Sequence, residues 1–254
     1  LTNVKKLTLY DNYIYLLNIK AGFKMYVERD CSVCLAKSLN CFAKLPPEDK
    51  ASISSFKSST IIKRGQIIFH EGRTPQGVYC LNDGKVKIYR LGCDGKEQVV
   101  RIVTPSSFFG LRALISGWNY STAAVTLEDS VVCFIPKRPF LKVTLKYPDV
   151  SHCLMVALSS LLEDAESKLL SLAQKPVRER LAETLLALHE VFNKNGGNNH
   201  INLSRTDLAN IIGTATECVI RLLSEFKDEH LIDINGRKIS IRNFEELKKI
   251  GKIN

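Results

Sequence analysis

Long hydrophobic runs are missing from this sequence. The stretch Leu7–Ile19 is apolar, but Asp11, Asn12 and Asn18 interrupt it, so it is too short and too polar to span a bilayer. It also lacks the small-residue cleavage site of a secretory signal. We therefore expect a cytoplasmic protein that has no membrane partner.

Catalytic motifs are missing as well. The sequence contains no glycine-rich phosphate loop, no nucleophile motif and no pair of acids in a recognisable setting. We therefore expect that the protein is not an enzyme.

Methionine is scarce, and the first one is Met25. We expect residues 1–24 to come from a non-methionine start codon or from an over-extended gene model. Residues 1–30 are accordingly set apart as an N-terminal tail that belongs to no domain.

Positive charge and cysteine are present in excess. The net charge of +10 and the pI near 9.2 favour an acidic partner, and nucleic acid comes ahead of membrane because no basic amphipathic helix stands out. The eight cysteines come without a secretory signal. They therefore indicate a reducing compartment, where thiols serve metal binding, redox chemistry or core packing rather than disulfides.

Short β-rich segments alternate with turn signals between Ser58 and Pro136. This spacing is typical of an antiparallel barrel or roll. Asn82-Asp83-Gly84 and Asp94-Gly95 fit tight hairpins that need a positive φ. We expect strands over Gly77–Leu81, Lys85–Leu91 and Gln98–Val103, and we assign residues 31–148 to a sensor domain.

A helical period begins after Pro148. Apolar residues recur every three or four positions, at Leu154, Leu158, Leu161, Ala165, Leu169 and Leu172. They predict one long helix over residues 149–174, with a stripe that resembles a coiled-coil seam. A dimerisation helix is the favoured interpretation, and a helix packed only on its own barrel is the alternative.

The strongest pattern lies in residues 175–254, where a helix over Val177–Asn193 comes first. Ser204, with Asp207 three residues later, has the pattern of a helix N-cap, and Gly213 ends that helix. Thr214 and Glu217 repeat the capping pattern and open a second helix that runs to Phe226. Two short helices joined at a glycine are typical of a helix-turn-helix.

A hairpin follows the two helices. The segments Leu231–Ile234 and Lys238–Ile241 flank Asn235-Gly236, which is the strongest short-range hairpin signal. Helix, helix and hairpin in this order predict a winged helix-turn-helix that binds double-stranded DNA.

Four side chains lie on the polar side of the second helix near its start: Thr216, Glu217, Ile220 and Arg221. Arg221 can pair with guanine through two hydrogen bonds, and Glu217 can accept one from cytosine. Alternatively, Glu217 closes a capping box with Thr214. Three further cations are expected to contact phosphates: Arg205, Arg237 and Lys238.

From Cys31 to Ile241 the sequence resembles the catabolite-activator/fumarate–nitrate-regulator (Crp/Fnr) family of bacterial transcription regulators. The resemblance rests on the Gly65/Gly72/Gly84 turns, on Phe108-Phe109-Gly110, on the long helix and on Leu203–Phe226. It implies an α+β fold with an N-terminal cyclic-nucleotide-binding-type β-roll, a long dimerisation helix and a C-terminal winged helix-turn-helix. It also implies a homodimer on a two-fold related operator, in contact with RNA polymerase.

Two departures from the family pattern affect the ligands. Ile220 stands where the best-known members have Ser or Gly, so their operator cannot be assumed. Leu111 and Tyr120-Ser121 replace the glutamate and the Arg-Ser or Arg-Thr pair of cyclic-nucleotide-binding relatives, and Arg112 is one residue out of place. Cyclic AMP is therefore disfavoured, because a buried phosphate without a cationic partner is costly.

The cysteines offer a different signal. Cys31, Cys34 and Cys41 precede the roll, and Cys133 falls where oxygen-sensing relatives place a fourth ligand. The resemblance therefore implies a [4Fe–4S] cluster that responds to oxygen or nitric oxide, although the family's last spacing is one residue shorter. Zinc on the same ligands is an alternative, and so is a Cys133 that only fills the core. We expect the remaining cysteines to be unpaired packing or surface residues: Cys80, Cys93, Cys153 and Cys218.

Two other functions stay open at this point. The same regulator could respond to an organic ligand or haem in the roll, with inert cysteines. A more remote alternative is a signalling adaptor with a cyclic-nucleotide-type domain and no DNA target.

Overall fold

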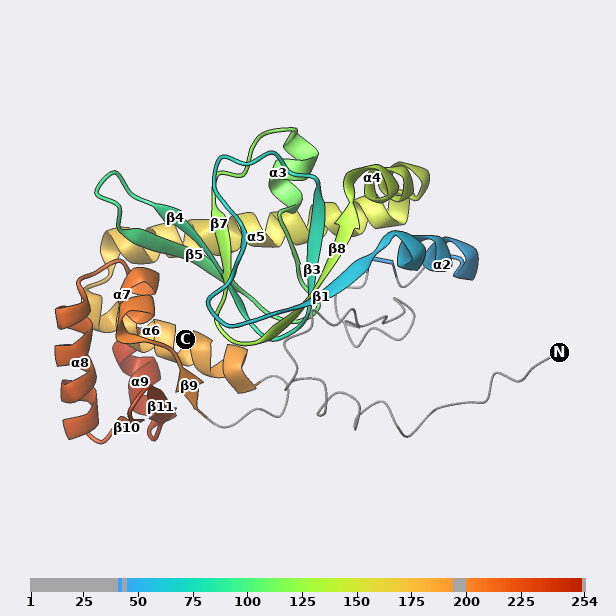
Figure 1. The fold of residues 1–254 in the computed structure, drawn as a ribbon. Coiled ribbons are helices and arrows are strands. Elements are labelled where there is room, and N and C mark those ends of the chain that lie inside the picture. Colours follow the sequence, from blue (N-terminus) through green and yellow to red (C-terminus); the bar gives the residue numbers. More distant parts are fainter. Residues whose placement is uncertain (1–40, 43–44, 194–199, 253–254) are drawn as a thin grey trace, which may run out of the picture.

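The computed structural model describes residues 41–42, 45–193 and 200–252 (Figure 1). The predicted tail, residues 1–30, and the first two candidate ligands, Cys31 and Cys34, lie outside the described residues. Within the described part, no helix is long and apolar enough to cross a membrane.

Residues 58–136 form the predicted roll, which is built from two antiparallel four-stranded sheets. One sheet has the strand order β1-β8-β3-β6, and the other has the order β2-β7-β4-β5. The strands are β1 (Ser58–Ile62), β2 (Ile67–Phe69), β3 (Gly77–Asp83), β4 (Val86–Leu91), β5 (Glu97–Val103), β6 (Phe108–Phe109), β7 (Ala123–Thr126) and β8 (Ser130–Pro136).

Glycine at position 84 shows why the roll needs its turn residues. Gly84 has a φ of +91°, and a Cβ atom there would lie 2.3 Å from the Ser130 hydroxyl oxygen. Any other residue would therefore be both strained and in collision with β8. This turn lets β3 pair with β8 while β4 crosses to the other sheet.

Two buried clusters lie on the two faces of the β1-β8-β3-β6 sheet. Phe69, Phe109 and Tyr120 belong to the cluster inside the roll. Cys41, Ile135 and Leu154 belong to the outer cluster. Four helices contribute buried side chains to it, namely α2 (Pro47–Phe56), α3 (Leu111–Ser116), α4 (Lys137–Lys146) and the start of α5 (Pro148–Gln174).

Helix α5 runs along the roll and leads into the C-terminal region (Figure 1). Only Val150 and Leu154 of this helix are buried. Leu154 therefore packs on its own roll and is not part of an outward seam, which corrects the predicted stripe at that position. Three other apolar side chains seven residues apart are exposed, namely Met155, Leu162 and Leu169.

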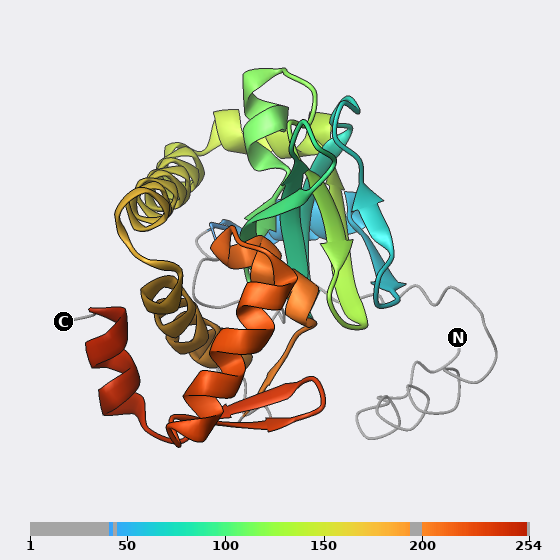
Figure 2. The same cartoon turned by 90° about the vertical axis from the view of Figure 1, so that its left-hand side faces the viewer.

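The C-terminal region has a core of its own. It consists of α6 (Val177–Asn193), β9 (Ile201–Asn202), α7 (Arg205–Ile212), α8 (Thr216–Asp228), β10 (Ile232–Asn235), β11 (Lys238–Ile241) and α9 (Phe244–Gly251). The hairpin β10–β11 is the predicted wing, and β9 adds a third strand to it. Figure 2 shows α8 on the surface, with the hairpin beside its lower end.

Candidate nucleic-acid interface

Local signals place the two helices of the helix-turn-helix. Ser204 is the N-cap of α7, and its hydroxyl oxygen accepts a hydrogen bond from the Asp207 backbone N–H at 2.9 Å. Gly213, with a φ of +70°, ends the helix in the left-handed conformation. Both ends of α7 are therefore fixed by the residues that predicted them, Ser204 and Gly213.

The predicted cap of α8 is wrong. The N-cap is Ala215, which makes no side-chain hydrogen bond, and the helix begins at Thr216. The Thr214 backbone N–H donates instead to the Ala209 carbonyl and completes the end of α7. Glu217 is therefore the second helical residue, one position too early to close a capping box with Thr214.

Helix α8 presents a continuous exposed face beyond its buried side. Glu217, Ile220 and Arg221 are exposed, and Thr216 is half-buried. Ser224 lies on the same face, one turn after Ile220 and Arg221. Sequence reasoning missed Ser224, although its spacing from Ile220 gives the signal. The polar side chains of this face carry hydrogen-bonding groups of the kind that can read base edges in a major groove.

An ion-pair network orients Arg221. Its guanidinium lies 2.6 Å from a Glu225 carboxylate oxygen, one turn along α8, and 65% of the arginine side chain is exposed. The other Glu225 oxygen lies 3.2 Å from Arg178 of α6. Arg178 also pairs with Glu229 and lies over the Phe226 ring. The Arg221 guanidinium thus lies beside Glu225 on the exposed face.

The three predicted phosphate contacts differ in their surroundings. Arg237 and Lys238 are exposed at the tip of the β10–β11 wing. Arg205 is half-buried and donates to the Gly236 carbonyl at 2.9 Å, which ties the start of α7 to the wing. Burial lowers the pKa of Arg205, and its Nη1 atom has no hydrogen-bond partner among the described residues.

Helix α7 is also bound by the roll. Lys87 of β4 lies 2.8 Å from Asp207 and 2.5 Å from Glu97 of β5, and only 12% of its side chain is exposed. Burial alone would raise the pKa of Asp207, but hydrogen bonds from Lys87 and Ser204 outweigh it and lower that pKa. At the other end of α7, the Gln98 amide donates to the Asn210 carbonyl at 2.8 Å. The β4–β5 hairpin therefore holds α7 at both ends.

Helix α5 is bound to the same hairpin. The Lys168 ammonium donates to the Val99 carbonyl at 2.6 Å. Burial lowers the pKa of Lys168 to about 8. The roll, the long helix and the C-terminal region are thus connected at the β4–β5 hairpin.

Aromatic rings occupy the interior of the roll. The Phe69 and Tyr120 rings stack with their centroids 4.0 Å apart, and Tyr79 and Phe109 stack beside them. Burial raises the pKa of the Tyr120 hydroxyl. Arg112 is exposed and donates to the Ser121 hydroxyl. The two residues that replace the phosphate-binding pair are thus a buried ring and the partner of a surface arginine.

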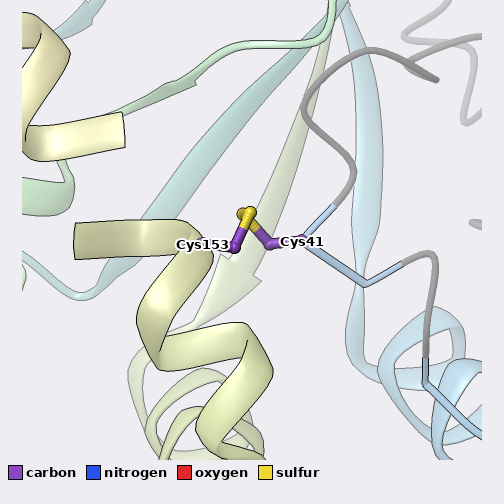
Figure 3. Close-up of a disulfide and its surroundings, with 2 residues drawn as sticks. All are labelled: Cys41 and Cys153. Carbon is purple, nitrogen blue, oxygen red and sulfur yellow. A yellow bond between two sulfur atoms is a disulfide. The ribbon is translucent and has the colours of Figure 1, made fainter. Parts of the chain in front are cut away.

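The cysteines are not arranged as predicted. Cys41 forms a disulfide with Cys153 of α5 (Figure 3). This corrects two predictions, the unpaired state of Cys153 and the absence of disulfides. The fold brings the segment before α2 against the second turn of α5, where the two Cα atoms are 5.5 Å apart, within the range that a disulfide spans.

Cys133 is buried in β8, and its sulfur lies 3.2 Å from the Ser59 hydroxyl oxygen. Within the described residues, no group of three or more His, Cys, Asp or Glu side chains is placed to hold a metal ion. With its sulfur bonded to Cys153, Cys41 is not available as a thiolate. The described side chains therefore do not fit a four-thiolate cluster in this state.

Comparison with known proteins agrees with this architecture. Residues 60–147 match the family model of the cyclic nucleotide-binding domain, and residues 179–250 match that of the Crp-like helix-turn-helix domain. The chain belongs to the Crp/Fnr family. It is a DNA-binding transcription regulator of the Crp/Fnr type.

Individual relatives cover most of the chain. The transcriptional activator protein Anr of Pseudomonas protegens is 29% identical over 220 residues, which are 84% of this chain and 87% of that protein. The fumarate and nitrate reduction regulatory protein of Escherichia coli is 27% identical over 74% of this chain and 76% of its own length. The structure of FixK2 from Bradyrhizobium japonicum has a TM-score of 0.69 and 26% identity, over 76% of this chain and 96% of that one.

Proposed function

We propose that this Crp/Fnr regulator reads its operator with the exposed face of α8, with Glu217, Ile220 and Arg221 at the base edges. The observation that carries the proposal is the exposed Arg221, which pairs with Glu225 on a face that no other described element covers. Arg237 and Lys238 of the wing contact the phosphate backbone. The bulky Ile220 favours a thymine methyl group at its position.

Operator selection from a random DNA library, followed by affinity measurement, tests this assignment. Arg221→Ala should lose about 1–3 kcal/mol on the selected site and little on random DNA. Lys227→Ala, an exposed cation at the other end of α8, is the matched control and should leave the ratio of the two affinities unchanged. Equal losses on both DNAs for Arg221→Ala would reassign this residue to phosphate binding.

We also propose that the protein is a homodimer whose two chains pair through α5. Met155, Leu162 and Leu169 are 57%, 61% and 68% exposed, and their spacing of seven residues is the heptad of a coiled-coil seam. A second copy of α5 would cover them and place two α8 helices on a two-fold related operator. Contact with RNA polymerase stays a prediction from the family.

Sedimentation of two variants checks the seam. Leu162→Glu should convert the dimer to monomer, because it places a charge between the two helices. Leu145→Glu is the control, because Leu145 lies on α4 and is 84% exposed. A dimer that survives Leu162→Glu but not Leu145→Glu would move the interface to α4.

We further propose that the signal acts on the N-terminal cysteine segment and not inside the roll. The stacked rings of Phe69 and Tyr120 fill the roll interior, and this packing supports the prediction that cyclic AMP is not the effector. The relatives named for fumarate and nitrate reduction support a [4Fe–4S] cluster on Cys31, Cys34, Cys41 and Cys133. Such a cluster requires Cys41 to be released from Cys153.

Anaerobic purification under reducing conditions tests the cluster. Absorbance at about 400 nm, with iron and sulfide counted per chain, should report the cluster. Protein that contains no iron, or whose DNA binding is unchanged by Cys133→Ala, would exclude the cluster and leave the DNA-binding assignment intact.

A further inference from the structure

The Cys41–Cys153 bond joins two parts of the chain that a signal would have to connect. Cys41 lies at the end of the segment that carries Cys31 and Cys34, and Cys153 lies next to Leu154 at the point where α5 packs on the roll. The same helix continues to the exposed seam at Leu162. The bond therefore fixes the N-terminal segment to the start of the proposed dimerisation helix.

Cys41 lies on the same side of the β1-β8-β3-β6 sheet as Cys133, the predicted metal ligand of the roll. Cys41 and Ile135 pack in the same buried cluster. Side chains alternate along a strand, so Cys133, two residues before Ile135 on β8, points to the same face of the sheet. The Cys41 sulfur is therefore on the correct side to join Cys133 at a metal, but it is bonded to Cys153.

We propose that Cys41 and Cys153 are an oxidation-sensitive thiol pair, and that their bond withholds Cys41 from metal binding. This inference rests on the proposed sensing role of the cysteine segment. Cys153 is the more accessible partner, because Cys41 is 6% exposed and Cys153 is half-buried. Its thiolate is therefore the group that an oxidant meets first.

The oxidant class is a low-molecular-weight disulfide. The Cys153 thiolate attacks one sulfur, forms a mixed disulfide and releases one small thiolate. The Cys41 thiolate then attacks the Cys153 sulfur and releases the second small thiolate. The two protons of the cysteine thiols end on the two released thiols, so one small disulfide is reduced for each protein disulfide formed.

The test uses the full chain in glutathione redox buffers with Co²⁺ as the metal probe. Non-reducing peptide mass spectrometry reports the 41–153 bond, and thiolate-to-cobalt absorption reports bound metal. The wild type should lose bound Co²⁺ at a glutathione disulfide concentration at least about tenfold lower than Cys153→Ser does, because only the wild type can close the bond. Cys93→Ser removes an exposed cysteine elsewhere and should behave like the wild type.

Each outcome decides one part of the proposal. If the 41–153 peptide is absent in oxidised protein, the thiol pair is refuted. Identical Co²⁺ curves for the wild type and both Cys153→Ser and Cys153→Ala, or a reduced wild type that binds no Co²⁺, refute the competition with metal. Operator binding is measured on the same samples. If the protein binds no operator in any redox state, the proposed function is refuted, while the peptide result still tests the thiol pair.

Discussion

The DNA-binding region from α6 to α9, which we call the reader, and the roll are stabilised in different ways. From α6 to α9, helices and wing share one mainly aliphatic core. The roll has two cores on the two faces of one sheet, of which one is rich in stacked aromatic rings and the other contains a disulfide. The reader has one continuous core, in which its first and last helices, α6 and α9, pack together, whereas the buried side chains of the roll are divided between the two faces of a sheet.

The single core of the reader indicates where a signal can act. A region with one core tends to unfold or move as a unit. The reader can therefore change position while its internal geometry stays constant, provided that the β4–β5 hairpin releases α7. The partly buried Ile102 and Leu127 of the roll pack against the reader core, and they add apolar surface to this junction.

The largest expected effect tests the single core of the reader. Phe226 has no exposed surface and belongs to this core, so Phe226→Ala should lower the free energy of unfolding of the reader by about 3–5 kcal/mol. Hydrogen exchange read by mass spectrometry should show lost protection from α6 to α9 and unchanged protection in the roll. Phe56→Ala, at a side chain that is 54% exposed, is the control. Loss of protection in both regions would show that they unfold together.

Reduction of the Cys41–Cys153 disulfide should lower protection in the roll and leave that of the reader unchanged. The bond closes a loop across 112 residues, so its reduction should remove about 2–4 kcal/mol of stability. The loss should appear in the roll and the start of α5, with the reader unchanged by hydrogen exchange. Cys93→Ser should have no effect in either redox state. A loss of protection centred on α8 would contradict the independence of the two regions.

The sequence could predict the features that are set locally, in both regions. Helix α6 was predicted at Val177–Asn193, as observed, and the wing follows from Asn235-Gly236. Such features are set by residues a few positions apart, through side-chain period and turn chemistry. Three strands of the roll, β3, β4 and β5, were predicted to within one or two residues for the same reason.

The features that were missed depend on long separations or on a shift of one residue. The Cys41–Cys153 bond and the Lys87–Asp207 pair join residues more than a hundred positions apart. Nothing in local pattern reports such a contact. The N-cap of α8 was wrongly predicted at Thr214, because the turn after Gly213 uses one more residue than the capping pattern assumed. The reading residues of α8 and the identity of the metal ligands remain predictions.

Loss of the Lys87 ion pair between the roll and the reader should have an intermediate effect. Lys87→Met leaves Asp207 and Glu97 without their shared cation, and it should weaken the docking of α7 by about 1.5–3 kcal/mol. Hydrogen exchange across α7 and β5 measures this loss. Lys63→Met is the matched control, because it breaks an ion pair with Asp129 whose side chains are 55% and 54% exposed, and such pairs contribute little. Equal effects of the two variants would show that Lys87 is only a surface charge.

The docking should also depend on pH in a defined direction. The lowered pKa of Asp207 means that its contribution is present above the ordinary aspartate value of about 4 and is lost as the pH falls through the lower, folded value. For Lys87, burial lowers the pKa but hydrogen bonds to Asp207 and Glu97 outweigh it and raise it. Its contribution is present below about 10 and is lost as the pH rises through the folded value. Lys87→Met should flatten both limbs of the profile.

The smallest expected effect distinguishes Ser204 from Thr214, two residues of the reader that both have the sequence pattern of an N-cap. Ser204→Ala should cost about 1 kcal/mol, because the Asp207 backbone N–H loses its acceptor. Thr214→Ala should cost well under about 0.5 kcal/mol, because Thr214 contributes its backbone and not its side chain to the end of α7. Urea unfolding of the two variants measures both values. Equal costs would mean that Thr214 caps α8 in solution. Glu217 would then be the third helical residue and would be engaged in the cap. Arg221 and Ile220 would in that case read the base edges without Glu217.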